Sequence, residues 1–340
     1  MKLLFIGFGT VGQGLSELLL AKQDELASQY GLDWKVVGIA DMLKGSAYDP
    51  NGLDLAEAVA RAERGEPLSS WSSVGCDWDA PTMIANADAD VMIEVTYTDI
   101  KTGQPATDYV RAALDRGMHV TTTNKGPVAL NSRELIARAA ARGTQFLYEG
   151  TVMAGTPLLN LIRETLAGST ISEMQGILNG TTNYILTQME AGMNYESALA
   201  RAQELGYAEA VPDADVLGWD ALGKVTILAN TVFGASLTPD DSPCEGITGI
   251  TTDDIAKAST EGQRFKLIGR VWRDGDQVRA SVGPKLMDLA HPLAGVGGAT
   301  NAMTITTDAL DDVTIVGPGA GRVETGFSLL NDLLAIRRQI

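Results

Sequence analysis

Cysteine is almost absent from this 340-residue chain, which contains only Cys76 and Cys244. Two cysteines this far apart indicate neither a disulfide framework nor a metal-binding motif. Neither has a lysine, arginine or histidine close to it in the sequence, so the surroundings expected of an activated thiolate are missing. The sequence therefore argues against an enzyme that works through a cysteine thioester.

Long apolar runs and an excess of positive charge are missing as well. No apolar segment approaches the ~20 residues that a membrane-spanning helix needs. The N-terminal stretch MKLLFIGFGTVG breaks on glycines instead of continuing into a signal-peptide core, so we expect a cytoplasmic protein. The 26 basic and 43 acidic residues give a net charge of −17, which argues against nucleic acid or an anionic membrane as partner. An acidic composition with few lysines is also typical of salt-adapted proteins.

What the sequence does contain, over its first 135 residues, is an alternation of short apolar strands and amphipathic helices. The connections are short, which predicts right-handed βαβ units and a parallel sheet of the Rossmann type. The fold class is therefore α/β. The expected strands are 3–6, 34–41, 89–98 and a last one that ends at Lys125.

The pattern changes after this point, because long helical patterns then alternate with extended runs. This mixture predicts a second domain of the α+β class. We place the dinucleotide-binding domain at 1–135, the second domain at 136–309, and a final segment, 310–340, that returns to the first domain. The expected helices of the second domain are 157–168, 183–206 and 216–234, and its extended runs are 173–180, 277–286 and 301–308.

Gly7, Gly9 and Gly12 match the pattern G-x-G-x-x-G between a predicted strand and a predicted helix. The first glycine permits a tight turn, the second lets the backbone approach a pyrophosphate, and the third lets helix and strand pack closely. The start of the helix, at Thr10 and Val11, would offer backbone N–H groups to the phosphates. These five residues are predicted to bind a dinucleotide.

Asp41 ends the second predicted strand, where a carboxylate usually accepts hydrogen bonds from the adenosine ribose and repels a 2′-phosphate. This favours NAD over NADP. Lys44, three residues later, could neutralise a 2′-phosphate, so NADP remains open. Thr96 and Thr98, near the end of a later strand, are expected beside the nicotinamide half of the cofactor.

Lys125 follows a β-branched run and precedes Gly126 and Pro127, which we predict to form a turn. A lysine at the carboxyl end of a Rossmann strand lies where cofactor and substrate meet. There it can supply positive charge or a proton to a reacting oxygen. The alternative is an ordinary solvated lysine.

The densest group of ionisable residues lies in LGYAEAVPDADVLGWDALGK, residues 205–224. Pro212 is expected to keep its first part in a loop, whereas the part after Gly218 is predicted to be helical, with Asp220 and Lys224 on one face. Three interpretations are open: a solvated acidic loop with a surface ion pair, a divalent-metal site, or a pocket for an amino-acid substrate. The carboxylates are those of Glu209, Asp213, Asp215 and Asp220.

Several motifs, in order and over nearly the whole chain, resemble those of homoserine dehydrogenases. They are GFGTVG, EVTYTDIKTGQPATDYVRAALDRGMHVTTTNKGPVAL, YEGTVMAGTPLLNLIRETLAG, GILNGTTNYILTQM, AQELGYAEAVPDADVLGWDALGKVTILAN, HPLAGVGGATNAM and GPGAGRVETG. The resemblance implies interconversion of L-homoserine and L-aspartate 4-semialdehyde with NAD or NADP, in threonine, methionine and isoleucine biosynthesis. It also implies a homodimer formed through the second domain. The chain looks like a short form without an ACT-type domain or an aspartate kinase.

The resemblance assigns roles to individual residues. Lys224 would be the proton donor, supported by Asp220, while Lys125 would orient the substrate; from the residues alone either lysine could move the proton. The substrate would be held by Glu209, Gly206, Asp215 and Lys125, and Gly319 of the last glycine motif would join the cofactor-binding residues. A monovalent cation such as sodium would be held by Glu149, Val152, Ala154 and Thr156.

One departure from the family pattern lies in the acidic loop. The family often reads Glu-Ala-Asp-Pro-Thr, whereas this chain reads Glu209-Ala-Val211-Pro-Asp213, so one loop carboxylate is displaced by two positions. Two other functions fit part of the sequence: a non-catalytic module that senses NAD(P), and a dehydrogenase acting on a related amino acid. A sensor would keep the glycine loop but would not need two placed lysines and an acidic amino-acid pocket.

Overall fold

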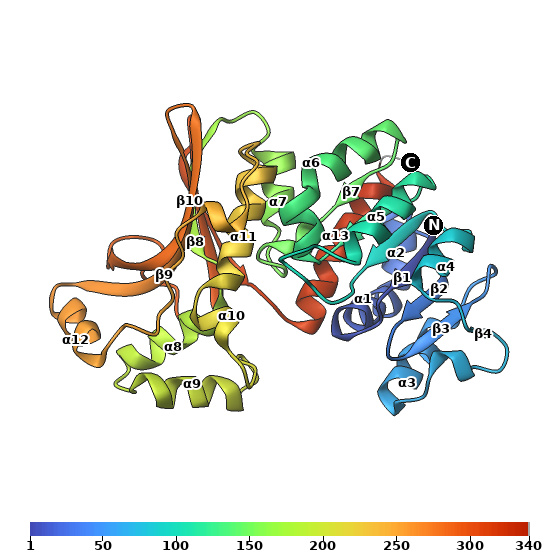
Figure 1. Cartoon of the computed structure of the whole chain (residues 1–340), viewed down its shortest axis with the longest axis horizontal. Coiled ribbons are helices and arrows are strands. Elements are labelled where there is room, and N and C mark those ends of the chain that lie inside the picture. The colour runs from blue at the N-terminus through green and yellow to red at the C-terminus, as the bar shows by residue number, and fades with distance from the viewer. Residues whose placement is uncertain (339–340) are drawn as a thin grey trace. The chain divides into compact units, whose positions relative to one another are not determined.

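The structure is a computed structural model that describes residues 1–338, and it divides into two compact units. The first unit comprises Met1–Gly155 and the chain from Gly321 onward, and the second comprises Thr156–Ala320 (Figure 1). The division falls later than the expected 135, because that position lies inside the continuous helix α6 (Lys125–Ala141). The return to the first unit also begins later than 310, since a strand of the second unit occupies 311–318.

The first unit contains a seven-stranded sheet of order β4-β3-β2-β1-β5-β6-β7. The last five strands in this order, from β2 to β7, are parallel to one another, which confirms the Rossmann-type sheet. β3 and β4 add antiparallel strands at one edge that the sequence did not predict, since four and two residues are too short for a periodic pattern. The strands are β1 (Lys2–Ile6), β2 (Lys35–Asp41), β3 (Gly45–Tyr48), β4 (Gly75–Cys76), β5 (Val91–Glu94), β6 (His119–Thr122) and β7 (Phe146–Leu147).

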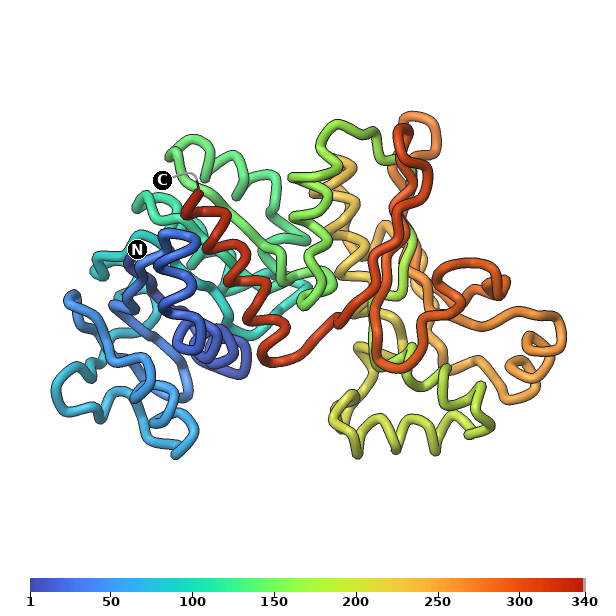
Figure 2. Tube along the Cα trace, turned by 180° about the vertical axis from the view of Figure 1, so that it is seen from behind, coloured from blue at the N-terminus to red at the C-terminus, as the bar shows by residue number. Residues whose placement is uncertain are grey.

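Helices pack on this sheet, and the last of them comes from the end of the chain. In Figures 1 and 2, α13 runs beside α1 in both views. Gly14 of α1 lies against the backbone of Arg322. Leu329 and Leu333 of α13 join the buried core of the unit. Besides α6, the helices are α1 (Thr10–Ala21), α2 (Gln23–Tyr30), α3 (Leu55–Arg64), α4 (Ala80–Asn86), α5 (Ala106–Asp115) and α13 (Arg322–Arg337), with short 3₁₀ turns η1 (Leu68–Ser70) and η2 (Glu149–Thr151).

The second unit contains a five-stranded antiparallel sheet of order β10-β9-β8-β11-β12 and several helices, as expected for the α+β class. The strands are β8 (Ile171–Ile177), β9 (Gln263–Asp274), β10 (Gln277–Asp288), β11 (Thr300–Thr307) and β12 (Asp311–Pro318). The helices are α7 (Leu158–Asn160), α8 (Gly180–Glu190), α9 (Tyr195–Glu204), α10 (Asp213–Val216), α11 (Trp219–Thr231) and α12 (Thr252–Thr260), with the short turns η3 (Leu161–Thr165) and η4 (Pro239–Asp241).

Three helix predictions need correction. The segment 183–206 is two helices, because Gly192 ends α8 with a positive φ of 101° and Asn194 caps α9. The segment 157–168 holds only the short α7 and a π-helical turn. The segment before Pro212 is a loop, as predicted, but a short helix, α10, begins directly after this proline. Within residues 1–338, no helix is both long enough and apolar enough to cross a membrane.

Candidate active site

The glycine loop of the first unit has the geometry expected of a phosphate-binding turn. Gly7 has a φ of +91°, and a Cβ there would lie 2.6 Å from the Val95 carbonyl oxygen, so no other residue fits. A Cβ on Gly9 would meet nothing within 4 Å, which leaves room over the loop. Among the described residues, no side chain caps the start of α1 at Thr10. The amides of this turn can therefore serve an external anion.

Asp41 lies at the end of β2, as predicted, but its carboxylate already has backbone partners. Oδ2 accepts a hydrogen bond from the Phe8 amide at 2.7 Å, and Oδ1 accepts from the amides of Leu43 and Lys44, both at 2.9 Å. Asp41 thus ties the glycine loop to the β2–β3 turn. A carboxylate has about four acceptor positions, so further acceptance from ribose hydroxyls is compatible with these bonds.

Lys125 is positioned differently from the prediction. β6 ends at Thr122, and Lys125 is the first residue of α6, whose N-cap is Asn124. The Asn124 Oδ1 accepts from the Gly126 amide at 3.1 Å, and Pro127 occupies the first turn of the helix, where its missing N–H costs nothing. The predicted Gly-Pro turn is therefore wrong. Lys125 is held at a helix start instead, and its side chain is half-buried.

Glu94 is a buried residue of this region that the sequence analysis missed. It ends β5, four residues before the predicted end, and has no exposed surface. Its carboxylate accepts from the Thr96 amide at 2.9 Å, from the Thr96 hydroxyl, and from the Thr122 hydroxyl at 2.7 Å. Burial raises the pKa of Glu94, and the threonine hydrogen bonds oppose that rise. Thr96 thus faces Glu94, whereas Thr98 is exposed.

The acidic segment of the second unit forms a buried cluster and not a solvated loop. Lys224 lies in α11 with only 8% of its surface exposed. Its Nζ donates to Asp220 Oδ2 and to the Leu178 carbonyl oxygen, both at 2.6 Å. Asp220 and Lys224 share one helix face, as predicted from their spacing. The surface-ion-pair interpretation is wrong, because the pair is packed beneath the segment that joins β8 to α8.

Asp215 is joined to this pair by Asn179, a residue that the sequence analysis did not single out. The Asn179 Nδ2 donates to Asp215 Oδ1 at 2.6 Å and to Asp220 Oδ2 at 3.0 Å. Burial raises the pKa of Asp215; the hydrogen bond from Asn179 opposes this, and the nearby Asp220 charge adds to it. The GILNGTTNY stretch contained Asn179, but only its amide contacts reveal what it does.

Other predicted substrate residues lie outside these hydrogen bonds. Glu209 is exposed in the loop after α9, where its backbone carbonyl accepts from the Gln203 side chain at 3.0 Å. Gly206, also exposed, has a φ of +76° just after α9. Asp213 starts α10 and is exposed. The structure therefore brings Asp215, Asp220 and Lys224 together, and within residues 1–338 no hydrogen bond joins Glu209 to them.

The four residues expected at a cation are buried but are divided between the units. Glu149, at 2% exposure, Val152 and Ala154 belong to the first unit, and Thr156 begins the second. The Thr156 hydroxyl donates to the Pro318 carbonyl oxygen at 3.0 Å. In the described part of the chain, no group of three or more His, Cys, Asp or Glu is arranged to hold a metal ion.

Gly319 also has a structural function within the second unit. A Cβ at this position would collide with the side-chain amide of Asn301 in β11. Gly319 therefore allows the end of β12 to pass close to β11. Its expected role in cofactor binding stays a prediction.

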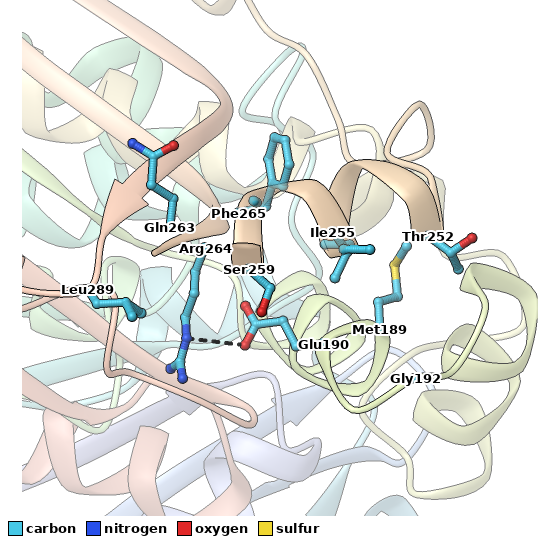
Figure 3. Close-up of a pocket in the computed structure, with 12 residues that line it drawn as sticks. Met189, Glu190, Gly192, Thr252, Ile255, Ser259, Gln263, Arg264, Phe265 and Leu289 are labelled. Atoms are coloured by element: carbon cyan, nitrogen blue, oxygen red, sulfur yellow. Dashed lines mark ion pairs between the residues drawn. The ribbon is translucent and has the colours of Figure 1, made fainter. Parts of the chain in front are cut away.

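The second unit also has a cavity of about 480 Å³ between the end of α8, α12 and the start of β9 (Figure 3). Glu190 and Arg264 line it and form an ion pair at 3.6 Å, drawn as a dashed line. Met189, Ile255 and Leu289 add apolar surface. None of the predicted site residues lines this cavity, so it is separate from the Lys224 cluster.

Two family profiles match the chain in succession. The profile of the homoserine dehydrogenase NAD-binding domain covers residues 7–149, and the homoserine dehydrogenase profile covers residues 157–334. The chain belongs to the homoserine dehydrogenase family. It is thus an NAD(P)-dependent oxidoreductase that acts on a small molecule, and the resemblance found in the sequence is confirmed. A non-catalytic sensor and a dehydrogenase of a related amino acid are set aside.

Individual homoserine dehydrogenases match along almost their whole length. The NAD(+)-dependent homoserine dehydrogenase of Pseudomonas canavaninivorans is 43% identical over 99% of this chain and 96% of its own. The structure of a putative homoserine dehydrogenase from Archaeoglobus fulgidus has a TM-score of 0.89 and 37% identity, covering 99% of both chains. A hyperthermophilic archaeal homoserine dehydrogenase in complex with NADPH has a TM-score of 0.85 and 27% identity, covering 100% of this chain and 98% of that one.

Proposed function

We propose that this homoserine dehydrogenase interconverts L-homoserine and L-aspartate 4-semialdehyde, prefers NAD, and uses Lys224 to move the proton. The observation that most supports the proposal is the buried Lys224 ammonium, which is held by Asp220 and by the Leu178 carbonyl. The reaction would place the enzyme in the biosynthesis of threonine, methionine and isoleucine.

Bound NAD or NADP supplies or accepts the hydride in this reaction. The amides from Gly9 to Gly12, at the start of α1, would hold the pyrophosphate, because the amides of Gly7 and Phe8 already donate to Ala40 and Asp41. Lys125, at the carboxyl end of the parallel sheet, would fix the substrate by its charge. Asp215, together with Glu209 from the exposed loop near Gly206, would accept hydrogen bonds from the substrate ammonium group.

Proton transfer follows from the hydrogen bonds of Lys224. An ammonium group has three N–H donors, and two of them point at Asp220 and at the Leu178 carbonyl. The third is available for the substrate oxygen that becomes the homoserine hydroxyl. Asp220 holds the Lys224 ammonium in place by its hydrogen bond, and Lys224 would donate its proton to the substrate oxygen during reduction and recover it during oxidation.

Preference for NAD is supported by the position of Asp41 at the end of β2, where its charge would meet a 2′-phosphate. The Pseudomonas relative named as NAD(+)-dependent agrees with this choice. Lys44 and the archaeal relative whose structure is a complex with NADPH favour NADP instead. Asp41 is the weightier feature, since its carboxylate is fixed by three backbone amides.

Two further parts of the proposal come from the family resemblance. A monovalent cation at Glu149 and the carbonyls of Val152, Ala154 and Thr156 is one of them, and it is expected from the resemblance alone. A homodimer through the second unit is supported by apolar side chains exposed on or beside its sheet. The exposed fraction is 45% for Leu286, 55% for Leu289 and 52% for Val316.

The deciding experiment measures homoserine oxidation with NAD and NADP in parallel, over a range of salt concentrations. We expect turnover with both cofactors and a higher kcat/KM with NAD. Absence of turnover at every salt concentration, with cofactor binding retained, would contradict the proposed reaction. A kcat/KM that favours NADP would contradict only the cofactor assignment.

A further inference from the structure

Asn179 lies between β8 and α8, in the segment that packs over Lys224. It is 5% exposed, and its side chain is the N-cap of α8. The Asn179 Oδ1 accepts from the Thr182 amide at 2.9 Å and from the Thr182 hydroxyl at 2.9 Å. The Thr182 backbone amide can only donate, so this contact identifies the atom as the oxygen and leaves the amide nitrogen on the opposite side.

The amide nitrogen of Asn179 is therefore forced to face the acidic cluster. It has two N–H groups, and the structure provides two acceptors, Asp215 Oδ1 at 2.6 Å and Asp220 Oδ2 at 3.0 Å. The side chain thus uses its oxygen for the helix start and its nitrogen for the two carboxylates. Reversing the amide would place an oxygen against both carboxylates and would leave the helix cap without an acceptor.

The cluster needs such a donor because its charges do not balance. Two carboxylates, Asp215 and Asp220, lie within reach of one nitrogen, while the single ammonium of Lys224 contacts Asp220. A neutral amide between the carboxylates reduces their repulsion without neutralising the charge on either one. The preceding residue contributes as well, since the Leu178 carbonyl oxygen accepts from Lys224 Nζ.

We propose that Asn179 is a positioning residue for the reaction, whose side-chain amide sets the spacing of Asp215 and Asp220 and, through Asp220, the position of the Lys224 ammonium. The inference rests on the proposed function, because it assigns Asp215 to the substrate and Lys224 to the proton. Asn179 would contact neither the substrate nor the cofactor. Its effect would be on homoserine and not on cofactor binding.

Asn194 provides a matched control for the experiment. It is also an asparagine N-cap, for helix α9, where its Oδ1 accepts from the Ser197 amide at 2.8 Å. It is exposed, and within residues 1–338 its side chain has no carboxylate partner. Serine is as good an N-cap as asparagine. Asn179→Ser and Asn194→Ser therefore both keep a capping oxygen, and only the first removes a bridge between two carboxylates.

We expect Asn179→Ser to lower kcat/KM for homoserine at least ~10-fold, as for loss of a hydrogen bond to a charged group, with cofactor KM changed less than about twofold. Asn194→Ser should leave both values within about twofold of wild type. Melting temperatures of both variants are measured as well, because removing a donor from two partly buried carboxylates also costs stability, and kcat/KM is compared at a temperature where both variants are folded. Near wild-type kcat/KM for homoserine in Asn179→Ser, or an equal loss in cofactor binding, would overturn the proposal.

A second measurement is independent of turnover. Titration of the Asp215 side-chain carboxyl by NMR should show a higher pKa in Asn179→Ser than in wild type, because the opposing hydrogen bond is lost. Asn194→Ser should leave that titration unchanged. If the wild-type enzyme does not oxidise homoserine, the proposed function fails, and this titration still decides whether Asn179 controls Asp215. An unchanged pKa of the Asp215 carboxyl in Asn179→Ser would contradict the inference.

Discussion

At the scale of single residues, the burial of the Asp220–Lys224 ion pair changes the contribution to stability that is expected of it. An exposed pair at this spacing would stabilise a helix by about 0.3–0.5 kcal/mol. Here the lysine side chain is 10% exposed and the aspartate side chain 18%, so removing either partner leaves a charge in a poorly solvated place. A variant at this pair therefore tests catalysis only if its folding is measured too.

Replacing Lys224 or Lys125 by alanine should lower kcat at least ~100-fold, the usual scale for losing a general acid or a fixed charge. Cofactor affinity, followed by fluorescence titration, should change little. Lys257→Ala is the matched control, because Lys257 is an exposed lysine on α12 and should have no effect. Near wild-type kcat in a folded Lys224 or Lys125 variant would remove that lysine from the mechanism.

Asp41 combines two functions that substitution can separate. Asp41→Ser removes the charge that repels a 2′-phosphate, so kcat/KM with NADP should rise relative to NAD. Asp41→Asn removes the charge but keeps an acceptor for the Leu43 and Lys44 amides, and should show the same shift with less loss of overall affinity. Steady-state kinetics with both cofactors checks this. An unchanged NADP-to-NAD ratio in both variants would show that Asp41 does not choose the cofactor.

At the scale of secondary structure, the contact between α1 and α13 attaches the end of the chain to the first unit. A Cβ on Gly14 would collide with the Arg322 backbone, and a Cβ on Gly326 would lie 2.5 Å from the Leu15 amide. Each helix thus presents a glycine to the backbone of the other. Helices can pack this closely only where a side chain is missing.

Gly14→Ala tests this contact because helix propensity predicts a gain in stability and packing predicts a loss. Alanine in a helix interior is favoured over glycine by about 1 kcal/mol. The collision with Arg322 should outweigh this, so we expect net destabilisation of about 1–3 kcal/mol, seen as a lower melting temperature. Gly168→Ala, where a Cβ meets nothing within 4 Å, is the control. A stabilised Gly14→Ala would mean that α13 does not pack closely on α1.

For the whole molecule, charge and exposed apolar surface bear on assembly. The net charge of −17 makes copies of the chain repel one another at low salt. The apolar side chains of Leu286, Leu289 and Val316 favour association through the second unit. Two-fold pairing is the commonest arrangement for such a surface.

We therefore expect light scattering to give twice the chain mass of 35.9 kDa at salt concentrations where the enzyme is active. Val316→Asp should weaken the dimer, because it places a charge in the expected interface. Leu43→Asp is the control, since Leu43 is 84% exposed and lies in the first unit. A mass near 36 kDa for the active wild-type enzyme would contradict this expectation.

The sequence by itself determined the family, the glycine loop, the parallel sheet and the shared helix face of Asp220 and Lys224, because each depends on residues close together or on motifs in a set order. It could not determine that Lys125 starts a helix. The stretch 124–127 is compatible with a turn or with a capped helix start, and only the contacts of the Asn124 side chain show that it caps a helix. The burial of Glu94 and the bridge from Asn179 to Asp215 and Asp220 were decided only by the tertiary structure. These features join residues up to 41 positions apart, and no local pattern in the sequence records which amide nitrogen meets which carboxylate.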